Sequence, residues 1–476
     1  MGHWRELEIA KQRTRYRPLI RPWDHQARGI KRLWRMGSAL LWWDTGIGKT
    51  KTVCDYAFAR HLAGQVDRIL VVCPLAAVGV WEQEVKKQLP VSSVASRNDW
   101  KRLSEVQGAV HELKKQPGPQ WVIVTYNALQ SYAKFLSQQF DPHMIVFDES
   151  HYLKTYSSTR TKRAMYMARQ APYVVCLSAT PAPNGYIDLY YQIKMVDPTV
   201  LPPTISEFRS QFCVMGGFMG REIKGYKNRK ELARRLARVT LRQKKDILNL
   251  PPEIDQVVPV TLDARSQRVY DTMQEDMVVT MSSGRETLAT SALTMQLRLG
   301  QITGGFLDGE PVGEQAKLKV LSSLLESMEG QKVIVWALFR DEIDAIGNLL
   351  DRLKISHTVI TGDVTGRKRT DAIKAFQTED NPQVLVCQIA ALGVGVTLTA
   401  ASIAIYYSFD WKADVYEQTR GRIARPGQKH TCHYIHLLAK GTVDEDKYHV
   451  VQNKMATQEA LGYFVRRMQS AGAESA

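Results

Sequence analysis

Short apolar runs separated by amphipathic stretches recur along the chain in two series. In the first half, the runs lie at residues 38–43, 68–74, 120–126, 143–149 and 173–179. In the second half, they lie at residues 332–339, 356–362, 383–389, 401–408 and 432–439. Continuous apolar strands that alternate with helical segments are typical of parallel sheets covered by helices on both faces. The pattern therefore predicts an α/β fold with two parallel-sheet domains in tandem.

The stretch between the two series has a different character. From residue 182 to about residue 315 the alternation is lost, and the sequence becomes helical and basic before the turn-forming Leu250-Pro251-Pro252. We expect a helical insertion and a linker there. The predicted organisation is a basic N-terminal segment over residues 1–36, a first domain over 20–245 with the insertion from about 182, a linker and helical region over 246–315, a second domain over 316–460 and a flexible tail over 461–476.

The chain is long and strongly basic. Its 476 residues predict two or three domains, because one domain commonly takes roughly 150 residues. Lys and Arg number 64 against 48 Asp and Glu, which gives a formal net charge of +16. A charge of this size favours a polyanionic partner, above all nucleic acid. If the charge were the only observation, the alternative would be that these charges only keep the protein soluble.

The sequence contains neither a secretory signal nor a membrane-spanning run. Its first residues mix charges and aromatics, and no run of about 18 apolar residues follows. We expect an intracellular protein with no membrane partner, in the cytoplasm or nucleoid of a bacterial or viral system or in a eukaryotic nucleus. Six cysteines are scattered singly, which predicts reduced thiols and no structural metal.

A glycine-rich segment follows the first apolar run and precedes a helical stretch. It reads Asp44-Thr45-Gly46-Ile47-Gly48-Lys49-Thr50. Glycines let backbone N–H groups turn toward phosphate oxygens, while Lys49 can reach the outer phosphates and Thr50 can ligate Mg²⁺. Trp43 stands where the strict spacing of such loops has glycine, so a plain strand-to-helix turn is the alternative. We predict that Thr45, Gly46, Gly48, Lys49 and Thr50 bind a nucleotide.

Two adjacent carboxylates end the apolar run at residues 143–149. Ligands of parallel sheets bind at the carboxyl ends of strands, which is where this run places Asp148 and Glu149. Asp148 can hold Mg²⁺, and Glu149 can orient and deprotonate the attacking water. An exposed strand end is the alternative for such a pair taken by itself. Together with the phosphate loop, the pair predicts nucleotide hydrolysis.

The motifs GxGKT, DESH, SAT and QxxxRxxRxGQ occur in this order between Gln26 and about Lys447. This order, with the segment LRQKKDILNLPP at residues 241–252, resembles the Swi/Snf-like branch of the superfamily 2 helicase-type ATPases. The resemblance implies two RecA-like domains, ATP hydrolysis with ATP and Mg²⁺, and a DNA partner that is double-stranded or branched. It also implies a monomeric motor.

The resemblance assigns further residues by matching position. Gln26 would read adenine and Gly395 would contact the nucleotide, while Arg422 and Arg425 would be arginine fingers that pair with the γ-phosphate. His151 either bonds toward the segment Ser178-Ala179-Thr180 or is an ordinary core histidine. The implied nucleic-acid contacts are Pro74, Trp81, Thr125, Tyr126, Arg242, Lys245 and Thr397. For Arg242 and Lys245, a solvated basic helix over residues 228–250 is the alternative.

Some motif residues of this chain differ from those of most family members. Leu392-Gly393 and Thr397 replace a Gly-Gly pair and an Asn, and the segment DESHYLK is similar to the branch that contains annealing helicases and compact bacterial or viral relatives. The resemblance therefore implies a DNA-stimulated translocase that remodels DNA or protein–DNA complexes, by strand annealing or fork remodelling. A strand-separating DNA or RNA helicase and a nucleotide-gated binding module without turnover stay open as alternatives.

Overall fold

The computed structural model describes residues 18–89, 92–96, 102–182, 185–217, 222–282, 288–364, 366–391 and 396–453. The chain divides into two compact units, Met1–Ile247 and Leu248–Ala476, each with its own sheet. The predicted N-terminal segment before residue 18, the predicted tail and Gly395 lie outside the described residues. In the described part of the chain, no helix is long and apolar enough to cross a bilayer.

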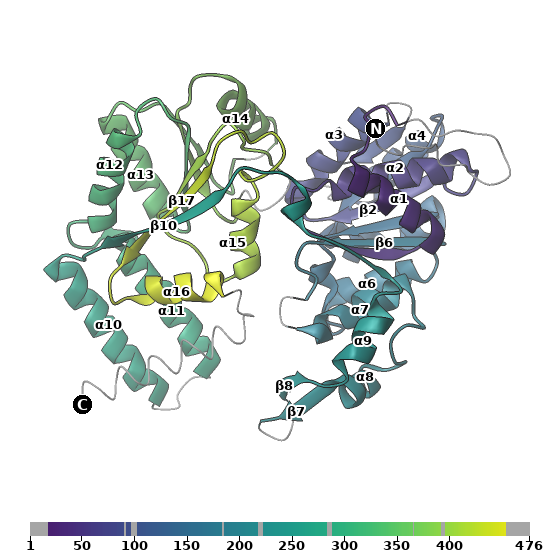
Figure 1. Cartoon of the computed structure of the whole chain (residues 1–476), viewed down its shortest axis with the longest axis horizontal. Helices are drawn as coiled ribbons and strands as arrows, with labels where there is room; N and C mark the ends of the chain where they lie inside the picture. Colours follow the sequence, from purple (N-terminus) through teal and green to yellow (C-terminus); the bar gives the residue numbers. More distant parts are fainter. Residues whose placement is uncertain are drawn as a thin grey trace. The chain divides into compact units, whose positions relative to one another are not determined.

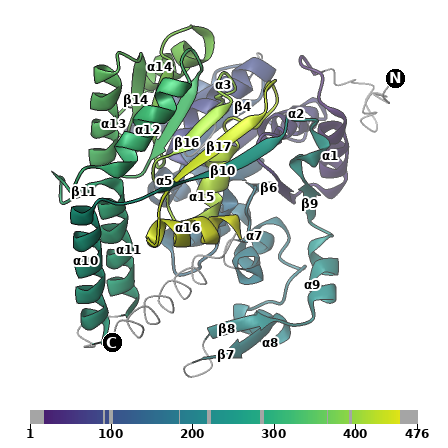
Figure 2. The ribbon, with the colours of Figure 1, turned by 60° about the vertical axis from the view of Figure 1, so that its left-hand side comes forward.

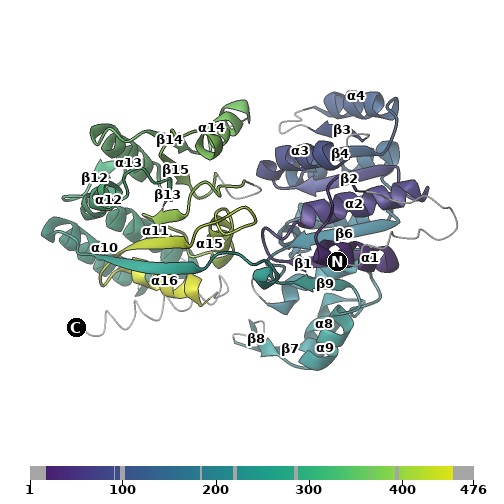
Figure 3. The same cartoon turned by 45° about the horizontal axis from the view of Figure 1, so that its top comes forward.

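The first unit is built on a parallel sheet, whose order over the described residues is β3-β4-β2-β5-β6-β1-β9. Figure 3 shows these strands crossing the unit with β3 and β9 at its two edges. The strands are β1 (Ala39–Trp43), β2 (Arg68–Cys73), β3 (Ser93–Ser96), β4 (Gln120–Thr125), β5 (Met144–Asp148), β6 (Tyr173–Ser178) and β9 (Thr240–Gln243). All carboxyl ends therefore meet at one edge of the sheet.

Helices cover both faces of this sheet, as Figure 1 shows for α1 and α2 on one face and α6 and α7 on the other. One core joins alternate strand residues such as Leu70, Val72 and Val124 to the apolar sides of α4, α5, α6 and α7. The helices are α1 (Asp24–Met36), α2 (Lys49–Leu62), α3 (Val78–Gln88), α4 (Leu103–Lys114), α5 (Tyr126–Phe135), α6 (Thr159–Ala168) and α7 (Leu189–Val196).

The region predicted as a helical insertion contains both helices and strands. It forms α7, α8 (Ile205–Phe212), the antiparallel hairpin of β7 (Cys213–Gly216) and β8 (Glu222–Tyr226), and α9 (Arg229–Leu236). In the basic stretch 228–250, α9 is followed by β9, which pairs in parallel with β1, and by a short 3₁₀ helix, Lys245–Ile247. Buried Val239 and Leu241 explain the change, because their side chains complete the edge of the sheet.

The second unit is built on another parallel sheet, with strand order β10-β17-β16-β13-β15-β14 over the described residues. The strands are β10 (Glu253–Val260), β13 (Val333–Ala337), β14 (His357–Ile360), β15 (Val384–Gln388), β16 (Ile403–Tyr406) and β17 (Cys432–Ala439). β10 lies in the stretch predicted as linker, so that boundary needs correction. It was missed because it is a largely exposed edge strand of mixed polarity.

Successive residues of β13 point into two separate cores. Val333 and Val335 pack with α12 (Ala316–Ser327) and α13 (Arg340–Arg352), while Ile334 and Trp336 pack with α14 (Gly366–Thr378), α15 (Ala413–Arg420) and α16 (Val443–Gln452). Figure 2 shows α10 (Ala264–Ser282) and α11 (Leu288–Gly304) side by side as a helical pair. This pair packs on α16 through a third core that includes Tyr270 and Leu299.

A buried group of charges ties α16 to the rest of the second unit. Lys317 Nζ lies 2.6 Å from Asp444 Oδ2, and it also donates to the carbonyl of Tyr407 at 3.0 Å. Thr303 Oγ1 donates to the other oxygen of Asp444 at 3.0 Å. Burial by itself would raise the pKa of Asp444, but the charges of Lys317 and Lys447 hold that pKa below its ordinary value. Removing Lys317 would leave the buried charge of Asp444 with weaker compensation, from Lys447 Nζ at 3.8 Å.

Candidate active site

A tight loop joins β1 to α2 at the carboxyl edge of the first sheet. Gly46 and Gly48 have φ angles of 81° and 83°, in the left-handed region that favours glycine. At Gly48 there is also no room for a side chain, because a Cβ atom would lie 2.1 Å from Gln26 Nε2. Helix α2 begins at Lys49, so its first N–H groups face the space in front of the loop.

Lys49 and Asp44 define the inner surface of this loop. Lys49 Nζ donates to the backbone carbonyls of Trp43 at 2.8 Å and Asp44 at 3.2 Å. The carboxylate of Asp44 accepts from the backbone N–H of Lys245 at 2.9 Å. The loop is thereby fixed to the end of β9 as well as to β1. Apart from its place at the start of the loop, nothing in the sequence indicated this role of Asp44.

The start of α1 packs against the same loop. Gln26 donates from Nε2 to the carbonyl of Ile47 at 3.3 Å, and its Oε1 accepts from the backbone of Trp23 at 2.9 Å. His25 Nε2 lies 2.8 Å from the same Ile47 carbonyl. Gln26 is buried between the start of α1 and the loop. Its role in reading adenine remains a prediction.

Asp148 ends β5 and is held in place by two donors. Trp81 Nε1 donates to Asp148 Oδ2 at 2.8 Å, and the backbone N–H of Glu149 donates to Oδ1 at 3.0 Å. Burial above all, then the neighbouring charge of Glu149, raise the pKa of Asp148 to about 6, against the Trp81 hydrogen bond and the Lys49 charge. Two crowded, buried carboxylates are the kind of site that a divalent cation stabilises.

Glu149 has a left-handed backbone, with φ of 50°, which turns its side chain away from the strand direction. Its Oε2 lies 3.3 Å from His151 Nδ1, and the same nitrogen lies 3.1 Å from Ser178 Oγ. Ser178 Oγ in turn accepts from the backbone N–H of Thr180 at 3.2 Å. Of the two roles left open for His151, the bond toward the Ser178 segment is therefore the one found in the structure.

Two residues predicted to contact nucleic acid are buried beside Asp148. Trp81 is 1% exposed and bonds to Asp148, and Tyr126 is also buried, with its hydroxyl donating to the carbonyl of Asp148 at 2.7 Å. Their contacts with nucleic acid remain predictions, and the burial of both side chains weighs against them. Thr125 Oγ1 accepts from Ala128 N at 3.1 Å as the N-cap of α5, and Pro74 precedes a short 3₁₀ helix. Their predicted contacts remain predictions.

Arg242 and Lys245 lie beside the phosphate loop, at the end of β9. The guanidinium of Arg242 lies 4.9 Å from the centre of the Trp42 ring, and the backbone N–H of Lys245 bonds to Asp44. Arg242 lies on strand β9 and not on the solvated helix considered as the alternative, whereas Lys245 begins a short 3₁₀ helix, Lys245–Ile247. The reason is that β9 follows the register of β1, with Arg242 opposite Trp42.

In the second unit, the predicted arginines gather on one carbonyl. Arg422 and Arg425 both donate from Nη1 to Val396 O, at 3.5 Å and 2.7 Å. Thr397, next along the chain, is exposed. Gln428 Nε2 donates to the carbonyl of Ala401 at 2.8 Å and holds the same segment from its other end. The structure brings these predicted residues together around residues 396–401.

Arg420 is a residue that sequence reasoning missed. It pairs with Glu253 at 3.2 Å and with Asp255, and its guanidinium lies 4.0 Å from the centre of the Tyr434 ring. It therefore ties β10 to α15, just before the segment that carries Arg422. The acidic residues of β10 are its only sequence signal, and they were assigned to the linker.

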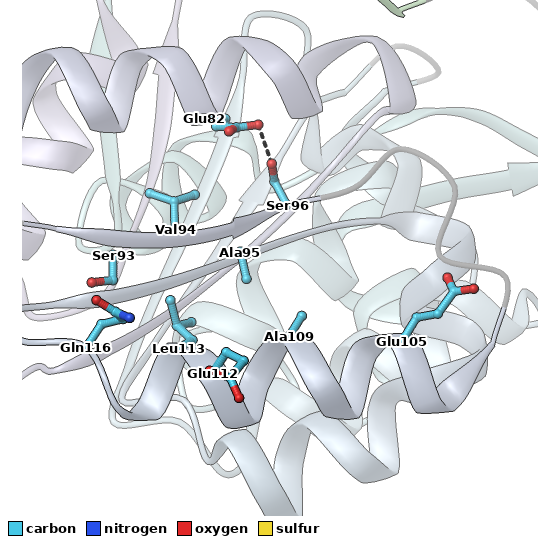
Figure 4. Close-up of a pocket in the computed structure, with 10 residues that line it drawn as sticks. All are labelled: Glu82, Ser93, Val94, Ala95, Ser96, Glu105, Ala109, Glu112, Leu113 and Gln116. Carbon is cyan, nitrogen blue, oxygen red and sulfur yellow. Dashed lines mark hydrogen bonds between the residues drawn. The ribbon is translucent and has the colours of Figure 1, made fainter.

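A separate pocket of about 640 Å³ opens between β3 and α4, away from these residues. Figure 4 shows Glu82, Glu105 and Glu112 around it, with a hydrogen bond between Ser96 and Glu82. None of the predicted site residues lines this pocket.

The phosphate loop, the paired carboxylates and the second parallel-sheet unit define the class as a helicase-type ATP hydrolase with two RecA-like domains, which confirms the predicted fold class. The model of the SNF2-related domain matches residues 25–304, and that of the helicase conserved C-terminal domain matches residues 316–427. The chain belongs to the SNF2-related family.

Three curated relatives are similar over most of this chain. The uncharacterized ATP-dependent helicase MG018 of Mycoplasma genitalium is 27% identical over 84% of the chain and 38% of its own length. The Caenorhabditis elegans homolog of SWI/SNF-related matrix-associated actin-dependent regulator of chromatin subfamily A-like protein 1 is 29% identical over 88% and 59%. The mouse DNA annealing helicase and endonuclease ZRANB3 is 24% identical over 88% and 38%. The chain thus spans about two fifths to three fifths of these relatives.

Among solved structures, the Sulfolobus solfataricus SWI2/SNF2 ATPase core in complex with dsDNA is 22% identical. The match covers 92% of each chain with a TM-score of 0.45.

Proposed function

We propose that this protein is an ATP-driven, DNA-stimulated translocase that moves on double-stranded DNA and remodels DNA or protein–DNA complexes. The observation that carries the proposal is the pair Asp148 and Glu149, buried at the same sheet edge as the phosphate loop and within reach of the Lys49 charge. The names of two relatives, a DNA annealing helicase and an SWI/SNF-related regulator of chromatin, support DNA as the partner.

The residues present fit a Mg²⁺–ATP complex. Thr50 in the first turn of α2 and the carboxylate of Asp148 offer the hard oxygen ligands that Mg²⁺ prefers. When bound, Mg²⁺ would neutralise charge on the phosphates. Lys49 would bind the outer phosphate oxygens, and the N–H groups at the start of α2 would surround them.

Glu149 would orient the attacking water and take its proton. His151 Nδ1 lies 3.3 Å from one oxygen of Glu149, a contact that would help to direct the other oxygen toward the attacking water. Because His151 also contacts Ser178, a movement of the Ser178–Thr180 segment would change the position of the base. Nucleic acid bound near that segment would thereby alter the rate of hydrolysis.

The DNA grip would be independent of base sequence. The predicted contacts that are accessible or half-exposed are Pro74, Thr125, Arg242, Lys245 and Thr397. Contacts from loops and sheet edges to the phosphate backbone do not read a particular base. The net charge of +16 predicts binding that weakens steeply with salt as counterions compete for the phosphates. A monomer acting on duplex or branched DNA is part of the proposal.

The test is the ATPase rate of the full chain with equal nucleotide concentrations of duplex DNA, forked DNA, single-stranded DNA and RNA. The proposal predicts the strongest stimulation by duplex or forked DNA, and none in the Lys49→Ala variant. Stimulation by single-stranded DNA or RNA alone would favour a strand-separating helicase. Nucleotide binding without phosphate release would favour a binding module.

A further inference from the structure

An exposed aromatic residue, Tyr152, lies directly beside the catalytic carboxylates, and no role has been assigned to it above. Tyr152 is part of a short 3₁₀ helix, Ser150–Leu153, that follows Glu149. Tyr152 is 44% exposed, although it directly follows the buried His151. The ring stacks on His151, with centroids 4.9 Å apart and planes at 28°, and on Tyr126, at 5.6 Å and 29°.

Each of these two partners holds one of the carboxylate residues. His151 Nδ1 lies 3.3 Å from Glu149 Oε2, and the Tyr126 hydroxyl donates to the carbonyl of Asp148 at 2.7 Å. Both partners are buried, whereas Tyr152 reaches solvent. Tyr152 therefore contacts both His151 and Tyr126 and is also exposed to solvent.

Arg160, at the start of α6, covers the same rings. Its guanidinium carbon lies 5.3 Å from the centre of the Tyr152 ring and 5.5 Å from that of Tyr126. Its buried Nε has no hydrogen-bond partner among the described residues, so the aromatic faces are a main part of what holds it. A guanidinium held in this way can turn toward a phosphate at the surface. This movement would change its contacts with the Tyr152 and Tyr126 rings.

We propose that Tyr152 is a positioning residue: with Arg160 above it, its ring fixes His151 and Tyr126, and nucleic acid on this face acts on Glu149 and Asp148 through it. The inference rests on the proposed function and adds a route for DNA stimulation. It needs no contact between Tyr152 and the nucleotide. The hydrolysis step itself stays with Glu149.

The test compares Tyr152→Ala, Tyr152→Phe and the control Tyr156→Ala in the full chain. Tyr156 is 49% exposed and also stacks on a tyrosine, Tyr191, but it does not touch His151 or Tyr126 in the contacts that the described residues make. We expect Tyr152→Ala to lower kcat about tenfold, because two stacking contacts that orient the carboxylates are lost. Tyr152→Phe keeps the stacking, so it should stay within about twofold of wild type, as should Tyr156→Ala.

A positioning role separates kcat from binding. KM for ATP, affinity for a fluorescent ADP analogue and affinity for duplex DNA should each stay within about twofold in Tyr152→Ala. The inference is overturned if Tyr152→Ala matches Tyr156→Ala, if Tyr152→Phe loses as much activity as Tyr152→Ala, or if the loss lies in KM alone.

Failure of the proposed function has a different result. If DNA does not stimulate the wild-type enzyme, the translocase proposal fails on the wild type, whereas Tyr152→Ala should still lower the DNA-independent kcat. Arg160→Met provides the second arm. It should reduce stimulation by DNA more than the DNA-independent rate, and equal reduction of both would contradict the route through Arg160.

Discussion

The hydrogen bond from Trp81 to Asp148 can be removed with little other change. In Trp81→Phe the buried aromatic ring is retained, but the donor that lies 2.8 Å from Asp148 Oδ2 is lost. A hydrogen bond to a charged group contributes about 1.5–3 kcal/mol, and about 1.36 kcal/mol corresponds to one pH unit in a pKa. The pKa of Asp148, already about 6, should therefore rise by about one pH unit or more, because a contact that favours the charged form is gone.

The sign of the pH effect follows from the role of the carboxylate. Asp148 must be charged to hold Mg²⁺, so hydrolysis should increase as the pH rises through its pKa. In Trp81→Phe this rise should occur at a pH about one unit higher, so for a one-unit shift kcat should fall about twofold at pH 7 and about tenfold near pH 5, where most of the carboxylate is protonated in both proteins. Raising the pH to about 8.5 should restore much of the difference.

The assay is the pH profile of the ATPase rate with saturating Mg²⁺ and ATP, measured beside Trp121→Phe. Trp121 is a suitable control because it is equally buried in β4, and its Nε1 has no hydrogen-bond partner among the described residues. Trp121→Phe should follow the wild-type profile apart from a modest loss of stability. If the two variants share one profile, the Trp81 bond does not set the charge of Asp148 and the reasoning fails.

The remaining predictions concern the base, the arginines, the β9 edge and the buried ion pair. Glu149→Gln should bind ATP with near wild-type affinity but hydrolyse it very slowly in a phosphate-release assay, and loss of nucleotide binding would make Glu149 structural. Arg425→Ala should lower kcat by about 10³-fold with a smaller change in ATP affinity, whereas a rate within about threefold of wild type would contradict an arginine finger. Arg242→Ala should reduce the stimulation of ATP hydrolysis by DNA and leave the DNA-independent rate unchanged. It should also flatten the salt dependence of DNA binding by about one phosphate contact, and an unchanged slope would mean that Arg242 contacts Trp42 but not DNA. Lys317→Met should destabilise the fold by about 3 kcal/mol in denaturant unfolding, since buried Asp444 loses its nearer lysine and keeps Lys447 Nζ at 3.8 Å, while the additional change Asp444→Asn should restore part of the loss.

The sequence predicted the elements whose pattern has one dominant physical cause. The buried strands of both sheets are uniformly apolar, and the loop at Gly46 and Gly48 needs residues that adopt positive φ, so both were visible in the chain. The edge strands β9 and β10 were not, because an edge strand is half exposed and its polar residues resemble those of a helix or linker. Their strand state depends on the neighbouring β1 and β17, which lie far away in sequence.

The site shows the same division. The identities of Lys49, Asp148 and Glu149 follow from their place after strands, whereas the partners of these residues do not. Trp81 was assigned to nucleic acid from its position in a motif, yet it lies 67 residues before Asp148 and points inward to it. Helix α3 turns that side of its surface toward the sheet, and this depends on tertiary packing that a motif does not encode.

The central claim is that ATP hydrolysis at Lys49, Asp148 and Glu149 drives movement along duplex DNA. The most direct measurement is displacement of a labelled third strand from a duplex that carries it at increasing distances from the free end. The account predicts displacement that requires ATP, that is delayed in proportion to the distance, and that is lost in Glu149→Gln although this variant still binds the duplex. The claim is contradicted if the same duplex stimulates ATP hydrolysis but the third strand is not displaced at any distance.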